Sequence, residues 1–299
     1  MTVMNAAFTV APPRYQLPKA LALGSVKLQV SNIEKSIAYY ERVLGLSVIH
    51  REATVAHLGA PGSDTMLVEL REKSGVRPVP QRGLLGLYHY AILLPTRASL
   101  GQFLAHIRSL GVRAGMSDHL VSEAIYLNDP DGLGIEVYAD RPRDSWQVDG
   151  SAIAMATDPI NVADLLAAGG GQAWSGAPVG TRMGHVHLYV GDLNEAAKFF
   201  HEGLGFDTVT LQFPGAVFMS AGGYHHHLGA NIWAAGAPIA TDDDARLLEW
   251  NIHLPLASDV AEVARSLEAG GNSALVENGS VFATDPWGTD VRISVNPMR

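Results

Sequence analysis

Hydrophobic and polar residues alternate with period two over residues 24–30 (GSVKLQV), and apolar residues then recur with a helical period over residues 33–44. The same succession returns 160 residues later, over residues 184–204. Asn32 and Asp192 stand between the strand-like and the helix-like part of each copy, where a side chain that accepts a hydrogen bond can cap a helix. Each copy therefore predicts a strand, a capped helix and a glycine stop.

A second pair of segments, residues 88–140 and 249–295, repeats a strand, a helix and further strands. The pattern thus predicts four βαβββ modules that begin near residues 24, 88, 184 and 249. A single module would leave a curved sheet with an open edge, so modules should pair into closed or half-closed barrels whose concave face receives a ligand or metal. We expect an α+β fold of two half-barrel domains, residues 21–140 and 183–296, joined by a connector with a docked helix over residues 141–182.

Composition excludes several classes of function. The net charge of −9 argues against nucleic acid or an anionic membrane as the main partner. Cysteine is absent, which excludes a disulfide framework, a thiolate zinc site, an iron–sulfur cluster and a cysteine nucleophile. The first residues do not resemble a signal peptide, and no apolar run approaches the roughly 18 residues of a membrane span. We therefore expect a cytoplasmic protein.

The most specific stretch of the chain is SDHLVSEAIYLNDPDGLGIEVYADRP, residues 117–142. Its residues 129–132 form a tight turn between two strands, which lets Tyr126 and Glu136 face one concavity. Glu136 alternates with apolar neighbours and so points to the opposite face of its strand. If that face lines the barrel, the buried carboxylate needs a partner, and a metal ion is the natural candidate. The alternative is a plain turn followed by a solvated strand residue.

Histidines on two first strands could complete such a site. His89 lies among apolar residues in YHYAILL, where a lone histidine is more often a core residue than a ligand. His185 opens the strand HVHLYV, and His187 lies on the same face two residues later. Two histidines and one carboxylate with open coordination positions form the ligand set of non-haem Fe(II) oxygenases, and Mn(II) accepts the same ligands.

Three consecutive histidines, His225 to His227, lie in or beside a later strand (GGYHHHLGANIW). Neighbours in a strand point to opposite faces, so the three cannot all bind one ion. They form either a surface tract with incidental metal affinity, or a group of which one or two line the cavity and hold or transfer protons there.

The four modules resemble the vicinal oxygen chelate superfamily. The spacing His119, Ile125-Tyr126, Asp129-Pro130, Gly132 and Glu136 is similar to the signature of its extradiol ring-cleaving dioxygenases, with Ser117 as the one departure from the preferred residues. Several tracts, among them GLYHYAILLP and SAGGYHHHLGANIW, look closest to the catechol 2,3-dioxygenase branch. The resemblance covers the chain from about residue 21 and is weakest in the fourth module.

The resemblance implies a metal held by His89, Glu136 and His185. It also implies an acid–base histidine at His119 and a tyrosine, Tyr126, that binds the substrate hydroxyl. One of His226 and His227 would match a further histidine of the site in the third module.

The resemblance also bears on how the modules pair. The fourth module has Arg292 where the family has its glutamate, and the first has Ser25 where the family has its histidine. The set His89, Glu136 and His185 therefore closes only if the second and third modules pair. If instead the first and second modules pair, Glu69 would become the third ligand.

The resemblance implies an Fe(II)-dependent enzyme, with Mn(II) as the other candidate, that opens a catechol-type aromatic ring with O2. A small aromatic diol and O2 would be its partners, and open sheet edges favour a homo-oligomer. Two alternatives remain on the same scaffold. One is a glyoxalase-type lyase or isomerase that uses Zn(II) or Ni(II) with four protein ligands, and the other is a metal-free binding protein of the bleomycin-resistance type.

Overall fold

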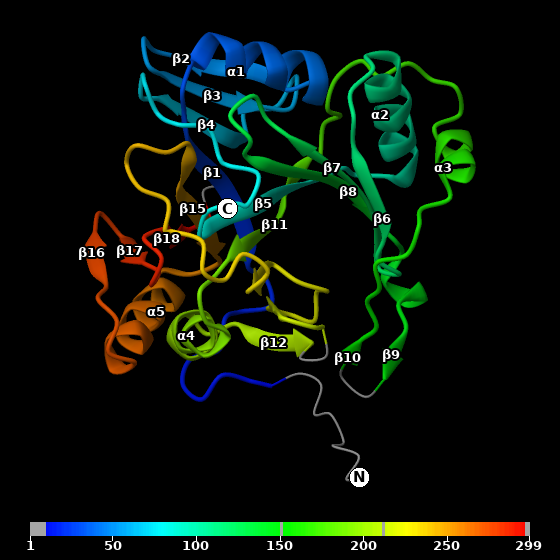
Figure 1. The fold of residues 1–299 in the computed structure, drawn as a ribbon. Coiled ribbons are helices and arrows are strands. Elements are labelled where there is room, and N and C mark those ends of the chain that lie inside the picture. Colours follow the sequence, from blue (N-terminus) through cyan, green and yellow to red (C-terminus); the bar gives the residue numbers. More distant parts are fainter. Residues whose placement is uncertain (1–9, 150–151, 211–212, 297–299) are drawn as a thin grey trace.

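The computed structural model describes residues 10–149, 152–210 and 213–296, which form two curled eight-stranded sheets with helices on their outer sides (Figure 1). Each sheet is built from two of the four repeated modules, so the predicted α+β fold of paired βαβββ modules is confirmed. None of the described helices has the length and apolar character needed to cross a bilayer.

The second and third modules share one sheet, which we call the inner-module sheet. Its strands follow one another in this order: β12 (Asp207–Thr210), β13 (Ala216–Ser220), β14 (Leu228–Asn231), β11 (Arg182–Tyr189), β5 (Gly86–Leu93), β8 (Gly134–Asp140), β7 (Ser122–Asn128) and β6 (Gly115–Asp118).

The first and fourth modules share the other sheet, which we call the outer-module sheet. Its strands follow one another in this order: β16 (Leu275–Glu277), β17 (Ser280–Thr284), β18 (Asp290–Val295), β15 (Arg246–Leu254), β1 (Ala22–Val30), β4 (Met66–Glu72), β3 (Val55–Gly59) and β2 (Ser47–Arg51). In Figure 1 its blue first module lies above its orange and red fourth module.

The modules pair through their first strands, β5 with β11 and β1 with β15, both antiparallel. This pairing covers the edge that each module would otherwise leave open. It joins the second module to the third and the first to the fourth, so the alternative in which the first and second modules pair is wrong. Because each sheet contains strands from both halves, the domain bounds 21–140 and 183–296 stay a prediction.

The helices begin and end as the repeats predict. Asn32 accepts a hydrogen bond from the backbone N–H of Lys35 at the start of α1 (Ile33–Tyr39), and Asp192 accepts hydrogen bonds from two N–H groups at the start of α4 (Leu193–Ala196). Gly45 and Gly205 end the corresponding helical segments at positive φ, where glycine is favoured. Both segments finish in a π-helical turn that the period-3.6 pattern does not reveal. The helical elements are α1 (Ile33–Tyr39) with η1 (Tyr40–Leu44), α2 (Arg97–Ser109), η2 (Arg143–Ser145), α3 (Val162–Ala168), α4 (Leu193–Ala196) with η3 (Ala197–Leu204), and α5 (Ala257–Ala269).

The connector does more than link the two halves. Its helix α3 docks beside α2, as expected, and Leu165 is buried there. It also contains the short strand pair β9 (Val148–Asp149) and β10 (Ala152–Ile153). Asp158 then bridges to Asp118 at the end of β6, so this part of the connector lies along the edge of the inner-module sheet.

Candidate metal centre

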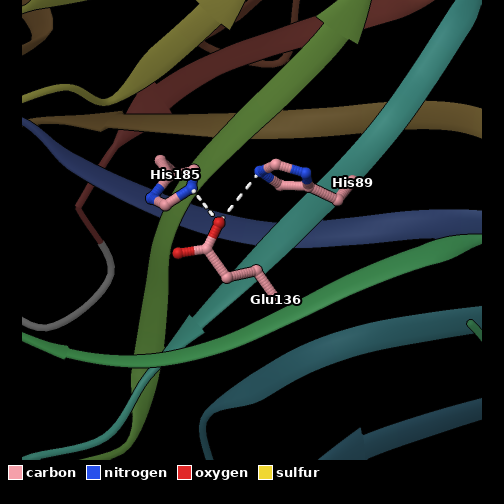
Figure 2. Close-up of side chains that lie close together, drawn as sticks. All are labelled: His89, Glu136 and His185. Carbon is pink, nitrogen blue, oxygen red and sulfur yellow. Dashed lines mark hydrogen bonds and ion pairs between the residues drawn. The ribbon is translucent and has the colours of Figure 1, made fainter. Parts of the chain in front are cut away.

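Three side chains converge in the concavity of the inner-module sheet: His89 from β5, Glu136 from β8 and His185 from β11. The Nε2 atoms of His89 and His185 lie 3.0 and 3.1 Å from the same oxygen, Oε2 of Glu136. Figure 2 shows both rings turned toward that oxygen. One candidate ligand atom from each residue lies within 4.8 Å of the others, which is close enough for a single ion.

Strand register explains why these three residues meet. Strands β5 and β8 run parallel with Ala91 beside Glu136, and β11 runs antiparallel to β5 with His185 opposite Ala91. His89 lies two residues before Ala91 on the same face. The three side chains therefore surround one point from three adjacent strands, and the apolar neighbours of Glu136 pack on the other face.

The protonation states fit a divalent cation. The three residues are between 1 and 5% exposed. Burial lowers the pKa of His89, although Glu136 opposes the shift. Burial alone would raise the pKa of Glu136, but His185 and His89 outweigh it and hold that pKa well below its usual value. Neutral imidazole and ionised carboxylate are the forms that bind metal.

Ring nitrogens of His89 and His185 that lack hydrogen bonds also indicate a metal site. Within the described part of the chain, no hydrogen bond is made by either ring nitrogen of His89 or by Nδ1 of His185. The contact from His89 to Glu136 is thus an ion-pair contact without hydrogen-bond geometry. Buried polar atoms without partners are costly, and a metal ion between these residues would satisfy the Nε2 atom of His89. The donor set therefore fits a metal ion.

A cavity of about 420 Å³ opens over His89 and Glu136. Aromatic and thioether side chains form much of its wall, and two of its residues, Met155 and Thr157, come from the connector. Ser117, the one departure from the dioxygenase signature, also borders it. The remaining apolar wall consists of Tyr88, Met116, Phe213, Phe218 and Trp233.

His119 and Tyr126 border the same cavity and are joined to each other. Nδ1 of His119 lies 2.6 Å from the backbone oxygen of Ala156, so this nitrogen donates. Nε2 is then an acceptor, and the Tyr126 hydroxyl donates to it at 2.6 Å. Burial, together with the charge of Glu136, raises the pKa of Tyr126 well above its usual value, so the phenol stays protonated.

The histidines His226 and His227 border different cavities. His226 borders the cavity over the metal centre, and His185 packs against its ring at a centroid distance of 4.1 Å. His227 borders two other cavities together with Arg182 and Tyr224, and burial lowers its pKa to about 3. Of the two histidines that the sequence left as alternatives, only His226 faces the metal centre.

His187 is a cavity residue whose place the sequence indicated without giving it a role. It lies opposite His89 on the same face as His185 and borders the cavity. Asn231 donates its amide to Nε2 of His187 at 3.0 Å. Burial, together with the neighbouring His89 and His185, lowers the pKa of His187 well below its usual value. A histidine two residues after a first-strand ligand was the signal for it.

The comparison with known proteins now decides the family. The model of the Glyoxalase/Bleomycin resistance protein/Dioxygenase superfamily matches residues 22–137 and 182–293. The chain belongs to this superfamily. A Bacillus subtilis (strain 168) protein named catechol-2,3-dioxygenase is 40% identical to it over 267 residues, which are 88% of this chain and 93% of that protein.

Solved structures of a glyoxalase and of a candidate dioxygenase share the fold. Glyoxalase I from Zea mays superposes with a TM-score of 0.57 at 18% identity, covering 92% of each chain. A candidate dioxygenase from Bacillus subtilis subsp. subtilis str. 168 superposes with a TM-score of 0.62 at 14% identity, covering 95% of this chain and 87% of that one. Within the superfamily, the His, Glu and His set of this chain fits a metal-dependent dioxygenase.

Proposed function

We propose that the protein is an extradiol dioxygenase that opens a catechol-type ring with O2, using Fe(II) or Mn(II) held by His89, Glu136 and His185. In such a reaction one carbon–carbon bond beside the diol breaks, and both oxygen atoms of O2 enter the product. The 40% identity to a protein named catechol-2,3-dioxygenase supports this assignment.

The observation that carries the proposal concerns the position in the third module that corresponds to Glu136 in the second. In the second module, Glu136 on the last strand lies beside the residue two positions after His89. The corresponding residue of the third module, beside His187, is Gly229. A site with four protein ligands would need a side chain there, and Gly229 offers none. Three ligands with open positions are the arrangement that non-haem Fe(II) oxygenases use.

A metal ion held by these ligands would supply Lewis acidity toward two neighbouring hydroxyl groups and electrons for O2. The chain's own residues do the rest. Tyr126 donates to His119, so its oxygen is free to accept a hydrogen bond from a substrate hydroxyl. His119, with its tautomer fixed by the Ala156 carbonyl, can receive a proton through Tyr126. His226 borders the cavity and can take a proton directly.

The cavity supports an aromatic diol as substrate class. Its volume of about 420 Å³ lies in the usual range for small-molecule sites. The aromatic rings of Phe218 and Trp233 are among its lining residues and offer apolar contact to a flat ligand. Such a cavity should hold one ring with its hydroxyl groups toward the three ligands.

Metal content and O2 uptake test the proposal together. Protein purified without air should contain about one iron or manganese per chain and should consume one O2 per catechol, with a yellow ring-opened product. Zinc or nickel without O2 uptake would contradict the proposal and favour a lyase or isomerase. A protein that binds no metal would instead favour a binding protein of the bleomycin-resistance type.

A further inference from the structure

The histidine just before His226 lines none of these three cavities. His225 is fully buried, at 0% exposure, behind the metal centre. Its Nδ1 lies 2.8 Å from Nδ1 of His226, and its Nε2 lies 2.9 Å from Oδ1 of Asp140. Asp140 ends strand β8, four residues after Glu136, and also accepts the hydroxyl of Tyr224 at 3.0 Å. A continuous chain of hydrogen bonds therefore runs from Asp140 to the cavity.

The chemistry of each group fixes the direction of this chain. An ionised carboxylate only accepts hydrogen bonds, so Nε2 of His225 carries a hydrogen and donates to Asp140. A neutral His225 then presents a lone pair at Nδ1 and accepts from Nδ1–H of His226. A neutral His226 has no second hydrogen, so its Nε2 is left as an acceptor. No described residue is bonded to that Nε2, and His226 borders the cavity.

We propose that Asp140 and His225 are positioning residues that hold His226 with a free Nε2 lone pair toward the substrate, ready to take a proton from a hydroxyl of the aromatic diol. The inference rests on the proposed function. In this step the O–H bond of the substrate breaks, and the proton forms an N–H bond at Nε2 of His226.

The arrangement explains why two histidines follow each other here. His119 obtains its tautomer from a backbone carbonyl, that of Ala156. For His226 the corresponding acceptor is another histidine, which is in turn oriented by Asp140. Packing of the His226 ring on His185 at 4.1 Å and on Phe218 at 4.9 Å limits its rotation. The same logic of an aspartate that orients a histidine operates in serine hydrolases.

Asp140→Asn is the sharpest test, because it keeps the shape of the side chain but can donate as well as accept. The direction of the hydrogen bonds is then no longer fixed, and kcat with catechol should fall by about 10²-fold at nearly unchanged KM and metal content. His225→Gln should act in the same way. Tyr224→Phe, which removes the other donor to Asp140, is the matched control and should change kcat less than about threefold.

Binding of 4-nitrocatechol under anaerobic conditions supplies a readout that a merely structural role would not move. The absorption band of this probe shifts to longer wavelength with each proton it loses. The iron-loaded wild-type protein and Tyr224→Phe should bind it in a more ionised form than Asp140→Asn and His225→Gln.

The possible outcomes separate a failure of the positioning role from a failure of the proposed function. If the wild-type enzyme cleaves catechol but Asp140→Asn and His225→Gln match Tyr224→Phe in both kcat and spectrum, the positioning role is wrong and the proposed function stands. If the iron-loaded wild-type protein neither binds 4-nitrocatechol nor consumes O2, the proposed function fails and the inference falls with it.

Discussion

The two sheets place different chemistry at the same cross-strand position. In the outer-module sheet, the first strands set Lys27 opposite Glu249, and their charged groups meet at 3.0 Å. In the inner-module sheet, the corresponding pair is His187 opposite His89. The backbone pairing is nearly the same, so the side chains alone decide what each concavity can do.

The difference shows how a repeated scaffold yields one site. At the position of Glu136, the outer-module sheet carries Glu69 beside Lys27 and Arg292 beside Asn251. Glu69 is bonded to Arg71 at 2.5 Å, so its charge is already balanced. The outer-module sheet thus satisfies its charges internally. The inner-module sheet leaves histidine nitrogens without partners among the described residues, which lowers stability. Binding of a metal ion would offset this loss.

Removing a side chain at corresponding positions of the two sheets should give the largest contrast. Glu136→Ala and His185→Ala should lose nearly all bound metal and lower kcat/KM for catechol by about 10³-fold or more, because two remaining ligands cannot fix the ion. Metal analysis and O2 uptake measure both effects. Glu69→Ala, the matched change in the outer-module sheet, should keep metal and activity. Metal retained in both inner-sheet variants would contradict the assigned ligands.

How much of this site could be predicted from sequence depends on the range of the interaction. The caps at Asn32 and Asp192 and the turn before Glu136 are local, and their patterns are visible in a few residues. The pairing of the second and third modules is not local. It was inferred only because Ser25 and Arg292 cannot act as the family ligands, and the structure agrees.

Other parts had no local signal. The contact of His225 with Asp140 joins residues 85 positions apart, and no periodicity reveals it. The connector was expected to be a linker with a docked helix, yet Met155 lines the cavity and the carbonyl of Ala156 binds His119. Such contacts depend on the tertiary path of an irregular segment, which sequence patterns do not encode.

The turns before the last strands should give the next largest effect. Asp129 and Asp285 occupy corresponding turns of the two sheets, and burial raises the pKa of each to about 7. The native state therefore holds a proton that the unfolded chain releases near pH 4, so stability falls as pH rises from about 4 to 7. Between about pH 5 and 8, the free energy of unfolding of Asp129→Asn should therefore fall by roughly 2–3 kcal/mol less than that of the wild-type protein. Urea unfolding at the two pH values measures it.

Asp285→Asn sharpens this comparison. Oδ2 of Asp129 lies 3.5 Å from the Tyr40 hydroxyl, whereas Oδ2 of Asp285 has no partner among the described residues. An asparagine amide would thus find an acceptor at position 129 but would bury an unpaired N–H group at position 285. Asp285→Asn should show the same loss of pH dependence but be less stable than Asp129→Asn by about 1–3 kcal/mol. Equal stability of the two variants would contradict the role of Tyr40.

A methyl group added at Gly229 should destabilise the protein. An ideal Cβ there would lie 2.8 Å from ring atoms of His187, so Gly229→Ala should lower the free energy of unfolding by about 1–3 kcal/mol. If the contact with His187 is the cause, Gly229→Ala should cost little stability when it is introduced into His187→Ala. Equal losses in both backgrounds would show that the strain lies elsewhere.

The smallest contrast lies in the hairpins at the outer edges of the two sheets. The outer-module hairpin turns at Asn278 and Gly279, both at positive φ, as a tight turn favours. The inner-module hairpin instead places Leu120 at a φ of 67°, directly after His119, where a leucine is strained. Leu120→Asn should raise the free energy of unfolding by about 0.5 kcal/mol, and Asn278→Leu should lower it by about 1 kcal/mol. Chemical denaturation of the two variants measures both changes. Opposite signs would show that the inner-module sheet accepts backbone strain beside His119 where the outer-module sheet does not. A loss of stability in Leu120→Asn would instead mean that packing of the leucine outweighs its backbone strain.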